Sequence, residues 1–233
     1  MNRKIEYKII RFESIASTNE YAKAQRAFGE NLYVVAKEQT GGRGTKGRSF
    51  SSARGGVYLS RLTFYQGFPA KDAFLVMAGA AAAVCETLKE YGLSPKIKWP
   101  NDVHVQGKKI CGILIENSFS GTELRNSVVG IGLNVSNPLP AELKEIATTV
   151  SAWLENPPSA ESVCQTLIEK LDKGYGADSY FSYLGYMGEE AEILQGEERF
   201  SARLLRVERD GSLVVQTADG ERKFSAAEIS LRV

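Results

Sequence analysis

The chain has 233 residues, 43% hydrophobic and 24% charged, so the composition predicts one or two folded domains rather than a disordered chain. Its 29 basic and 28 acidic residues give a net charge of +1, which argues against a general nucleic-acid-binding protein because such proteins carry a basic excess. Three scattered cysteines and a single histidine, His104, argue against disulfides, metal clusters and a Ser-His-Asp triad. We therefore expect a cytoplasmic protein whose chemistry depends on lysine, arginine, carboxylates and backbone groups.

No segment predicts export or membrane insertion. The opening stretch, MNRKIEYKIIRF, has no long apolar core and no cleavage site. The longest apolar run, Phe74 to Cys85, is too short to cross a hydrocarbon core of about 30 Å. We interpret this run as part of a buried helix and expect no membrane partner.

Strand-like and helix-like patterns are mixed in the first four fifths of the chain. In chain order they predict a strand at 6–12, a helix at 17–29, strands at 32–39 and 55–64, a helix at 72–91, strands at 96–99, 102–105, 109–119 and 127–136, and a helix from 159 onward. Ser17 and Glu20 have the spacing of a capping box at the start of the first helix. Because strands and helices do not alternate regularly, residues 1–187 are predicted to form an α+β domain with a mixed sheet.

Residues 188–233 have a different pattern. Apolar and polar residues alternate, and the alternation is broken at Asp210-Gly211 and Asp219-Gly220, which are strong hairpin-turn signals. We predict a second, small domain here, an antiparallel β-barrel.

The stretch KEQTGGRGTKGRSF, residues 37–50, places glycines and basic residues together after an apolar strand. Backbone N–H groups in such a loop can cradle an anion, and Arg43, Lys46 and Arg48 can add charge-assisted hydrogen bonds. The spacing matches neither a P-loop nor a dinucleotide-binding fingerprint. A solvated basic surface loop is the alternative interpretation.

The stretch KWPND, residues 98–102, follows the next predicted strand. Asn101 and Asp102 offer donors and acceptors suited to a purine, a ribose or magnesium, and Lys98 adds a cation. The alternative is a structural turn that buries Trp99.

Two further strands carry unusual residues. Lys109 opens the apolar strand KICGILIE, where a lysine is costly unless it meets a partner or keeps its head in water. Gly112 in that strand, and Gly130 and Gly132 in the next, suggest that another chain segment or a ligand passes close by. Asn134 would then be placed to bond a ligand.

The order and combination of these stretches resemble the biotin protein ligase family. The matching segments are STN at 17–19, QTGGRGTKGR at 39–48, KWPND at 98–102, KICGIL at 109–114 and GIGLNV at 130–135. The resemblance extends from about Phe12 to the C-terminus, where EISLR at 228–232 is similar to the end of the family's SH3-like domain. It implies a catalytic domain similar to class II aminoacyl-tRNA synthetases at 1–187 and an SH3-like barrel at 188–233.

The resemblance implies an enzyme that uses ATP and Mg²⁺ to convert biotin to biotinyl-5'-AMP. Biotin then passes to a lysine on the biotin carboxyl carrier protein of acetyl-CoA carboxylase or a related carboxylase. Relatives form dimers, so a homodimer is compatible with the resemblance.

The residue roles implied by the resemblance fall into three groups. The catalytic cations are Arg43 and Lys109. The residues matching the biotin site are Ser17, Thr18, Asn19, Gln39, Gly42, Arg43, Gly44, Thr45, Lys109 and Gly112. The residues matching the ATP site are Arg43, Lys46, Arg48, Lys98, Trp99, Asn101, Asp102 and Asn134. The ligands of the magnesium ion are not identified, Asp102 is a candidate base for the acceptor lysine, and Ser17 has helix capping as its alternative role.

Three features qualify the resemblance. Thr45 and Lys46 replace two arginines that the family often carries, which predicts weaker retention of the adenylate. Only 16 residues precede the STN segment, so we expect no DNA-binding module and no specific DNA partner. Cys111 lies beside Lys109, as a nucleophilic cysteine does in some acyl-transfer relatives, but an apolar strand favours a buried inert thiol.

A lipoate–protein ligase is the closest alternative function, because it shares the adenylating fold and a carrier-lysine target. The KWPND and glycine-loop segments favour the biotin side. A nucleic-acid-binding module is a more distant alternative, which the balanced charge and the lack of clustered stacking aromatics in the C-terminal part disfavour.

Overall fold

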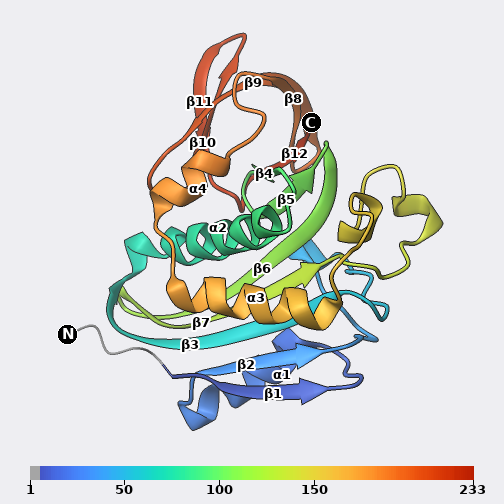
Figure 1. The fold of residues 1–233 in the computed structure, drawn as a ribbon. Helices are drawn as coiled ribbons and strands as arrows, with labels where there is room; N and C mark the ends of the chain where they lie inside the picture. The colour runs from blue at the N-terminus through green and yellow to red at the C-terminus, as the bar shows by residue number, and fades with distance from the viewer. Residues whose placement is uncertain (1–5) are drawn as a thin grey trace.

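The computed structural model describes residues 6–233, which form two sheets and four α-helices (Figure 1). The larger sheet contains β1 (Lys8–Phe12), β2 (Leu32–Ala36), β3 (Val57–Pro69), β4 (Pro95–Lys98), β5 (Asp102–Val105), β6 (Lys108–Ser120) and β7 (Glu123–Leu133). The smaller sheet contains β8 (Glu190–Gln195), β9 (Glu198–Val207), β10 (Leu213–Thr217), β11 (Gly220–Phe224) and β12 (Ser230–Arg232). The helices are α1 (Thr18–Ala24), α2 (Phe74–Glu90), α3 (Ala160–Lys173) and α4 (Ala177–Tyr183).

The larger sheet is mixed, as the sequence predicts. Its strand order is β1-β2-β3-β7-β6-β5-β4, with β1 and β2 parallel and every other neighbouring pair antiparallel. The α+β prediction is therefore confirmed, and each predicted strand is present with shifts of a few residues at its ends. The first predicted helix is α-helical only to Ala24 and continues as a 3₁₀ turn over Gln25–Phe28.

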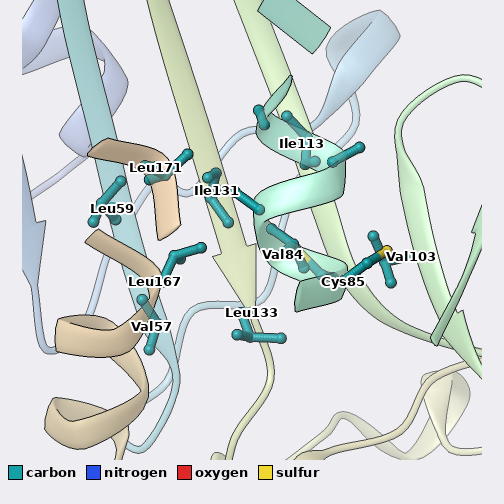
Figure 2. Close-up of a cluster of buried hydrophobic side chains, with 14 of the residues drawn as sticks. Val57, Leu59, Val84, Cys85, Val103, Ile113, Ile131, Leu133, Leu167 and Leu171 are labelled. Atoms are coloured by element: carbon teal, nitrogen blue, oxygen red, sulfur yellow. The ribbon is translucent and has the colours of Figure 1, made fainter. Parts of the chain in front are cut away.

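Helices cover both faces of this sheet (Figure 1). On one face, α2 and α3 pack on β3, β7 and β6, and Figure 2 shows side chains such as Leu59 and Ile131 meeting Val84 and Leu167. On the other face, α1 buries Ala22 against Leu32, Val34 and neighbours in a smaller cluster. Because α2 also contacts α3 and α4, it is enclosed by protein, which accounts for its alanine-rich sequence.

Helix α3 follows the sequence pattern closely. The Ser159 side chain caps it by accepting a hydrogen bond from the Ser162 backbone N–H at 3.1 Å. Val163, Leu167 and Leu171 lie on its buried face, as their four-residue spacing predicts. Helix α4 was not predicted from the sequence, because its seven residues, ADSYFSY, are too few to show a helical period.

The C-terminal part is antiparallel and β-rich as predicted, but it is not a closed barrel. Its strand order is β11-β10-β9-β8-β12, and the two end strands are not paired with each other. The predicted Asp219-Gly220 turn does join β10 to β11 as a hairpin. Strand β12, with three residues, pairs with β8 only, so it is an edge of the sheet.

Trp99 links the two sheets. Its side chain is 3% exposed and packs with Ile193, Leu204 and other residues of the C-terminal cluster, although it follows β4 of the larger sheet. Its indole N–H donates to the Gly211 carbonyl at 2.9 Å. The interpretation of Trp99 as a buried structural residue is therefore confirmed. Among residues 6–233, none of the helices is long and apolar enough to span a membrane.

We predict that Trp99→Ala lowers the free energy of unfolding by about 3–5 kcal/mol, because it leaves a cavity between the two sheets. Trp153→Ala is a suitable control, since Trp153 is 42% exposed and its indole donates only to Thr148 Oγ1. Its cost should be about 1 kcal/mol. Urea unfolding followed by circular dichroism measures both, and equal costs would contradict the linking role of Trp99.

Candidate functional site

Two adjoining cavities collect most of the residues singled out in the sequence. The first cavity, about 110 Å³, is lined by the predicted residues Ser17, Thr18, Asn19, Gln39, Arg43, Gly44, Thr45, Arg48, Asn101, Asp102, Lys109 and Gly112. The second cavity, about 360 Å³, is lined by the predicted residues Thr45, Lys46, Arg48, Lys98, Trp99, Asn101 and Asp102. The two share Thr45, Arg48, Asn101 and Asp102, so they form one continuous region.

The start of α1 gives the first cavity a polar wall. The Ser17 side chain caps the helix by accepting from the Glu20 backbone N–H at 3.4 Å. The Thr18 N–H and Oγ1 both donate to Gln39 Oε1, at 2.8 and 3.0 Å. Ser60 Oγ, on β3, lies 2.8 Å from Thr18 Oγ1 and 2.5 Å from Asn19 Oδ1. These fixed donors and acceptors can form hydrogen bonds with a small polar ring system.

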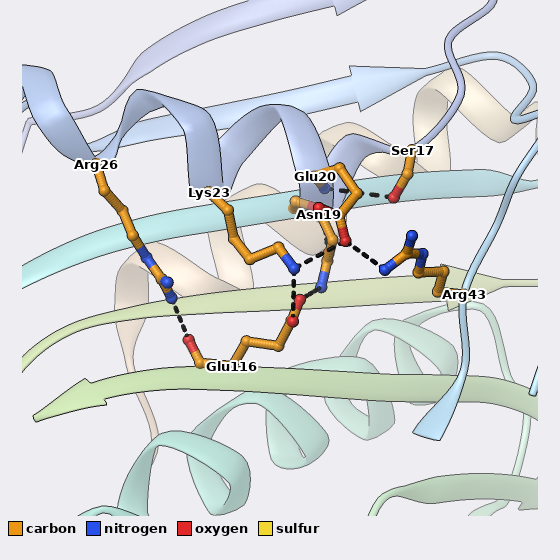
Figure 3. A network of polar contacts seen from close by, with 8 residues as sticks. Ser17, Asn19, Glu20, Lys23, Arg26, Arg43 and Glu116 are labelled. Carbon is orange, nitrogen blue, oxygen red and sulfur yellow. Dashed lines mark hydrogen bonds and ion pairs between the residues drawn. The ribbon is translucent and has the colours of Figure 1, made fainter. Parts of the chain in front are cut away.

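A network of charges holds Asn19 from the other side (Figure 3). Asn19 Nδ2 donates to Glu116 Oε2 at 3.1 Å, and Lys23 Nζ lies 2.8 Å from Glu116 Oε1 and 2.8 Å from Glu20 Oε1. The hydrogen bond from Lys23 to Glu116 is the largest cause that raises the pKa of Lys23. The hydrogen bond from Lys23 to Glu20 is the largest cause that lowers the pKa of Glu20. Sequence reasoning missed Glu116, although a carboxylate within the apolar stretch GILIE was a visible signal.

Arg43 reaches this network from the glycine loop. Its guanidinium NH1 lies 2.7 Å from Glu20 Oε1, and its side chain is 62% exposed. Lys109, on β6, lines the same first cavity and pairs with Asp102 on β5, with 2.7 Å between Nζ and Oδ1. The two cations thus approach one cavity from a loop and from the sheet, and each is held by a carboxylate of the protein itself.

Further cations surround Asp102. Burial is the largest cause that lowers the pKa of Lys98, and Lys109 and Arg48 lower it further while Asp102 opposes the shift. The Arg48 guanidinium donates from Nε to the Thr45 carbonyl oxygen at 3.3 Å and from NH2 to Thr45 Oγ1 at 3.1 Å. Such a concentration of positive charge around one carboxylate suits a polyanionic ligand.

Lys46 connects the glycine loop to the C-terminal sheet. Its Nζ donates to the Ile229 carbonyl at 2.8 Å and lies 3.0 Å from Ser230 Oγ. Asp210, Gly211, Ser212, Ser225 and Leu231 also line the second cavity, and sequence reasoning assigned none of them to it. Their contribution depends on how the C-terminal sheet packs, which no local motif indicates.

The glycines of β6 and β7 leave room for other parts of the chain. A Cβ atom on Gly132 would come within 2.5 Å of the Phe50 ring, and one on Gly112 within 3.3 Å of it. A Cβ atom on Gly130 would overlap the Asn19 side chain. The expectation that something passes close to these glycines is confirmed, and the passing segments are the chain's own α1 and glycine loop. Phe50 and Ser49, which line the first cavity, were not singled out in the sequence.

Two predicted site residues lie outside the linings of both cavities. Gly42 packs beneath the Phe50 carbonyl and Ser52 Oγ, where a Cβ would overlap them. Asn134 is 5% exposed, and its Oδ1 accepts from Asn137 Nδ2 at 3.1 Å. Both residues support the site's loops in this structure.

Cys111 and His104 are buried beside the site and are not poised for chemistry. Cys111 is 1% exposed, and burial raises the pKa of its thiol well above the usual value. His104 bonds Tyr186 Oη through Nδ1 at 2.8 Å, and burial lowers its pKa to about 4.

Across residues 6–233, no three His, Cys, Asp or Glu side chains are grouped to hold a metal ion. A magnesium ion that takes most ligands from phosphate and water needs only one or two carboxylates, and Asp102 in both linings fits that need.

Comparisons with known proteins agree with this geometry. The model of the biotin/lipoate A/B protein ligase family matches residues 11–134. The bifunctional ligase/repressor BirA of Bacillus subtilis (strain 168) is 31% identical over 243 residues, covering 96% of this chain and 74% of that protein. The biotin–acetyl-CoA-carboxylase ligase of Paracoccus denitrificans is 31% identical over 147 residues, or 57% of each chain.

Solved structures extend the likeness to the whole described fold. The apo biotin protein ligase from Aquifex aeolicus is 25% identical with a TM-score of 0.78, covering 97% of this chain and 99% of that chain. The Aquifex aeolicus ligase in complex with biotin and ATP is 29% identical with a TM-score of 0.72, covering 97% and 98%.

We predict that Gly132→Ala lowers the free energy of unfolding by about 1–3 kcal/mol, because the new methyl group forces the Phe50 ring to move. Gly176→Ala is the matched control, since its φ is −89° and a Cβ there meets no atom within 4 Å; because Gly176 is the N-cap of α4, the change should cost only about 0.5 kcal/mol. Urea unfolding should show little change for the control. If both variants were equally stable, Phe50 would not be packed against β7 as described.

Proposed function

Because the chain belongs to the biotin/lipoate A/B protein ligase family, we propose that it is an ATP-dependent biotin protein ligase. It joins the biotin carboxylate to AMP and then transfers the biotinyl group to a lysine of a biotin carboxyl carrier protein. The observation that carries this proposal is the convergence of Arg43 and Lys109 on one cavity beside a polar wall. Relatives and structural neighbours that are named biotin ligases favour biotin over lipoate.

Biotin is placed in the first cavity. Its ureido ring carries both donors and acceptors, which match the Thr18, Asn19 and Gln39 side chains at the start of α1. Its carboxylate then points to Arg43 and Lys109, which exchange their internal partners, Glu20 and Asp102, for the ligand.

ATP is placed with its phosphates at the junction of the two cavities, near Arg48, Lys98 and Lys46. A biotin carboxylate oxygen attacks the α-phosphorus, the bond from that phosphorus to the bridging oxygen breaks, and pyrophosphate leaves. Arg43 and Lys109 offset the repulsion between the two anions and the charge that grows in the transition state. Asp102 would hold Mg²⁺ together with phosphate oxygens, and the bound ion would neutralise charge on the transferring phosphate.

In the second step the amine of the acceptor lysine attacks the acyl carbon, and AMP leaves with the bonding electrons. The attacking amine must lose a proton, and Asp102 is the carboxylate that lines both cavities. We assign it as the proton acceptor in this second step, after pyrophosphate release has freed it from its proposed role as a magnesium ligand. Asn134, which is bonded to Asn137, is assigned a supporting role in the loop after β7 rather than direct nucleotide contact.

The wider assignments follow from the same proposal. We propose a cytoplasmic enzyme with a carrier protein of acetyl-CoA carboxylase or a related carboxylase as its substrate. No specific DNA partner is proposed, because the charge is balanced. We also propose that the C-terminal part begins at residue 188. We propose a homodimer as the assembly, which analytical ultracentrifugation would test.

The central experiment incubates the protein with ATP, magnesium, biotin and a purified carrier domain. Mass spectrometry of the carrier should show one added biotinyl group, and pyrophosphate release should require biotin. A parallel reaction with lipoate distinguishes the two ligase types. Modification with lipoate alone would replace the proposal by the lipoate ligase, and modification with neither would remove it.

We predict that Arg43→Ala slows biotin-dependent pyrophosphate release about 10²- to 10³-fold, as does removal of other groups that stabilise transition-state charge. Lys109→Ala should reduce the rate of both half-reactions. Arg54→Ala is the matched control, because Arg54 pairs with Glu13 and Glu38 and lines neither cavity. An undiminished rate in Arg43→Ala would contradict the assigned role.

Cys111→Ala should retain biotin transfer at close to the native rate, because the buried thiol takes no part in the proposed chemistry. Single-turnover transfer from preformed biotinyl-AMP measures this directly. Loss of transfer in a folded variant, together with trapping of a biotinyl thioester, would instead indicate a cysteine nucleophile.

A further inference from the structure

A third cavity, about 230 Å³, lies on the helical side of the larger sheet. Its walls come from β3, from the first turns of α2 and from the carboxyl end of α3. The residues that matter most here are Arg61, Tyr65, Phe68, Leu75, Leu171 and Tyr175. None of them belongs to the two cavities described above.

Arg61 brings a positive charge to this cavity. A guanidinium has five N–H donors, yet the structure shows one short side-chain hydrogen bond for Arg61 within residues 6–233, from NH1 to the Leu171 carbonyl at 3.1 Å. Its Nε also lacks a partner but is closed off from the cavity, so the donors that face a ligand are those of the two terminal nitrogens. Within that same range Arg61 has no ion pair with a carboxylate. A carbonyl in the last turn of α3 accepts a hydrogen bond from one of the Arg61 N–H groups, and the other N–H groups have no partner in that turn.

No carboxylate among the described residues pairs directly with Arg61, and the titratable groups that act on it are Tyr7, Tyr33 and Tyr65. Asp172 accepts a hydrogen bond from Tyr33 Oη at 2.7 Å and makes no ion pair with Arg61. Lys173 lies outside the cavity lining, with its Nζ 5.5 Å from the centre of the Tyr175 ring. Since a largely desolvated charge is costly without a counter-charge, the Arg61 guanidinium favours an anion.

The rest of the wall is apolar. Phe68, Leu75, Val76 and Leu171 face the cavity, and Leu75 is 40% exposed. A guanidinium fork matches the two oxygens of a carboxylate, and the apolar wall matches a hydrocarbon body. We propose that this cavity is a second ligand site that binds a small monocarboxylate with an apolar body.

The site lies on the opposite face of β3 from the first cavity. Successive residues of a strand point to opposite faces of the sheet. Ser60 contacts Thr18 and Asn19 of α1, whereas Arg61 faces α2 and α3. The site therefore stands whether or not the first two cavities hold biotin and ATP.

The test titrates benzoate into the full chain both without biotin and with biotin in excess, so that binding in the first cavity, which biotin would compete away, is distinguished from binding in the third. Isothermal titration should show saturable binding of benzoate, with benzamide and inorganic phosphate each at least tenfold weaker. If benzamide bound as tightly as benzoate, the proposed recognition of a carboxylate by Arg61 would be contradicted. If phosphate bound as tightly as benzoate, the proposed contribution of the apolar wall would be contradicted. Absence of saturable benzoate binding would overturn the site itself.

Two pairs of variants locate the binding. Arg61→Met should abolish benzoate binding, but it also removes the bond to Leu171 and can destabilise the fold. Leu75→Glu leaves that bond in place and should abolish binding by supplying a competing carboxylate, whereas Leu75→Gln, of matched size, should keep it within about threefold. Equal binding by the two Leu75 variants would place benzoate elsewhere and contradict the proposal.

Discussion

The functional region depends on one steric constraint, the bare backbone of β6 and β7 at Gly112, Gly130 and Gly132. Because no side chains project there, Asn19 and Phe50 rest directly on the sheet. Their position brings the start of α1 and the glycine loop to the same place as Lys109. A side chain at Gly130 or Gly132 would overlap Asn19 or Phe50 and separate these segments, so the polar wall and the cations would no longer meet.

Electrostatic pairing within the protein then sets the resting state of the region. Arg43 is held by Glu20, Lys109 by Asp102, and Lys23 by Glu116. Each of these three cations therefore has a carboxylate partner before any ligand arrives. An anionic ligand must compete with these carboxylates for the cations.

The sequence carried much of this information in local signals. Glycines in strands, a lysine opening an apolar strand and a basic glycine loop each indicated a place where something meets the sheet, and the structure brings them together. The signals failed where long-range packing decides the outcome. Glu116 gains its role from α1, the second cavity takes one wall from the C-terminal sheet, and Asn134 turns to Asn137. Closure of the predicted barrel failed for the same reason, because it depends on pairing between distant strands.

Strand β3 serves two surfaces at once, and this has a consequence for how the chain can vary. Ser60 and Arg61 are adjacent, yet one bonds α1 and the other bonds α3. Deleting or inserting one residue upstream in β3 would exchange their faces and turn the guanidinium toward the polar side chains at the start of α1. Length changes in related chains should therefore be tolerated at the bulge between Phe64 and Phe68, near the far end of β3, and excluded from its central stretch.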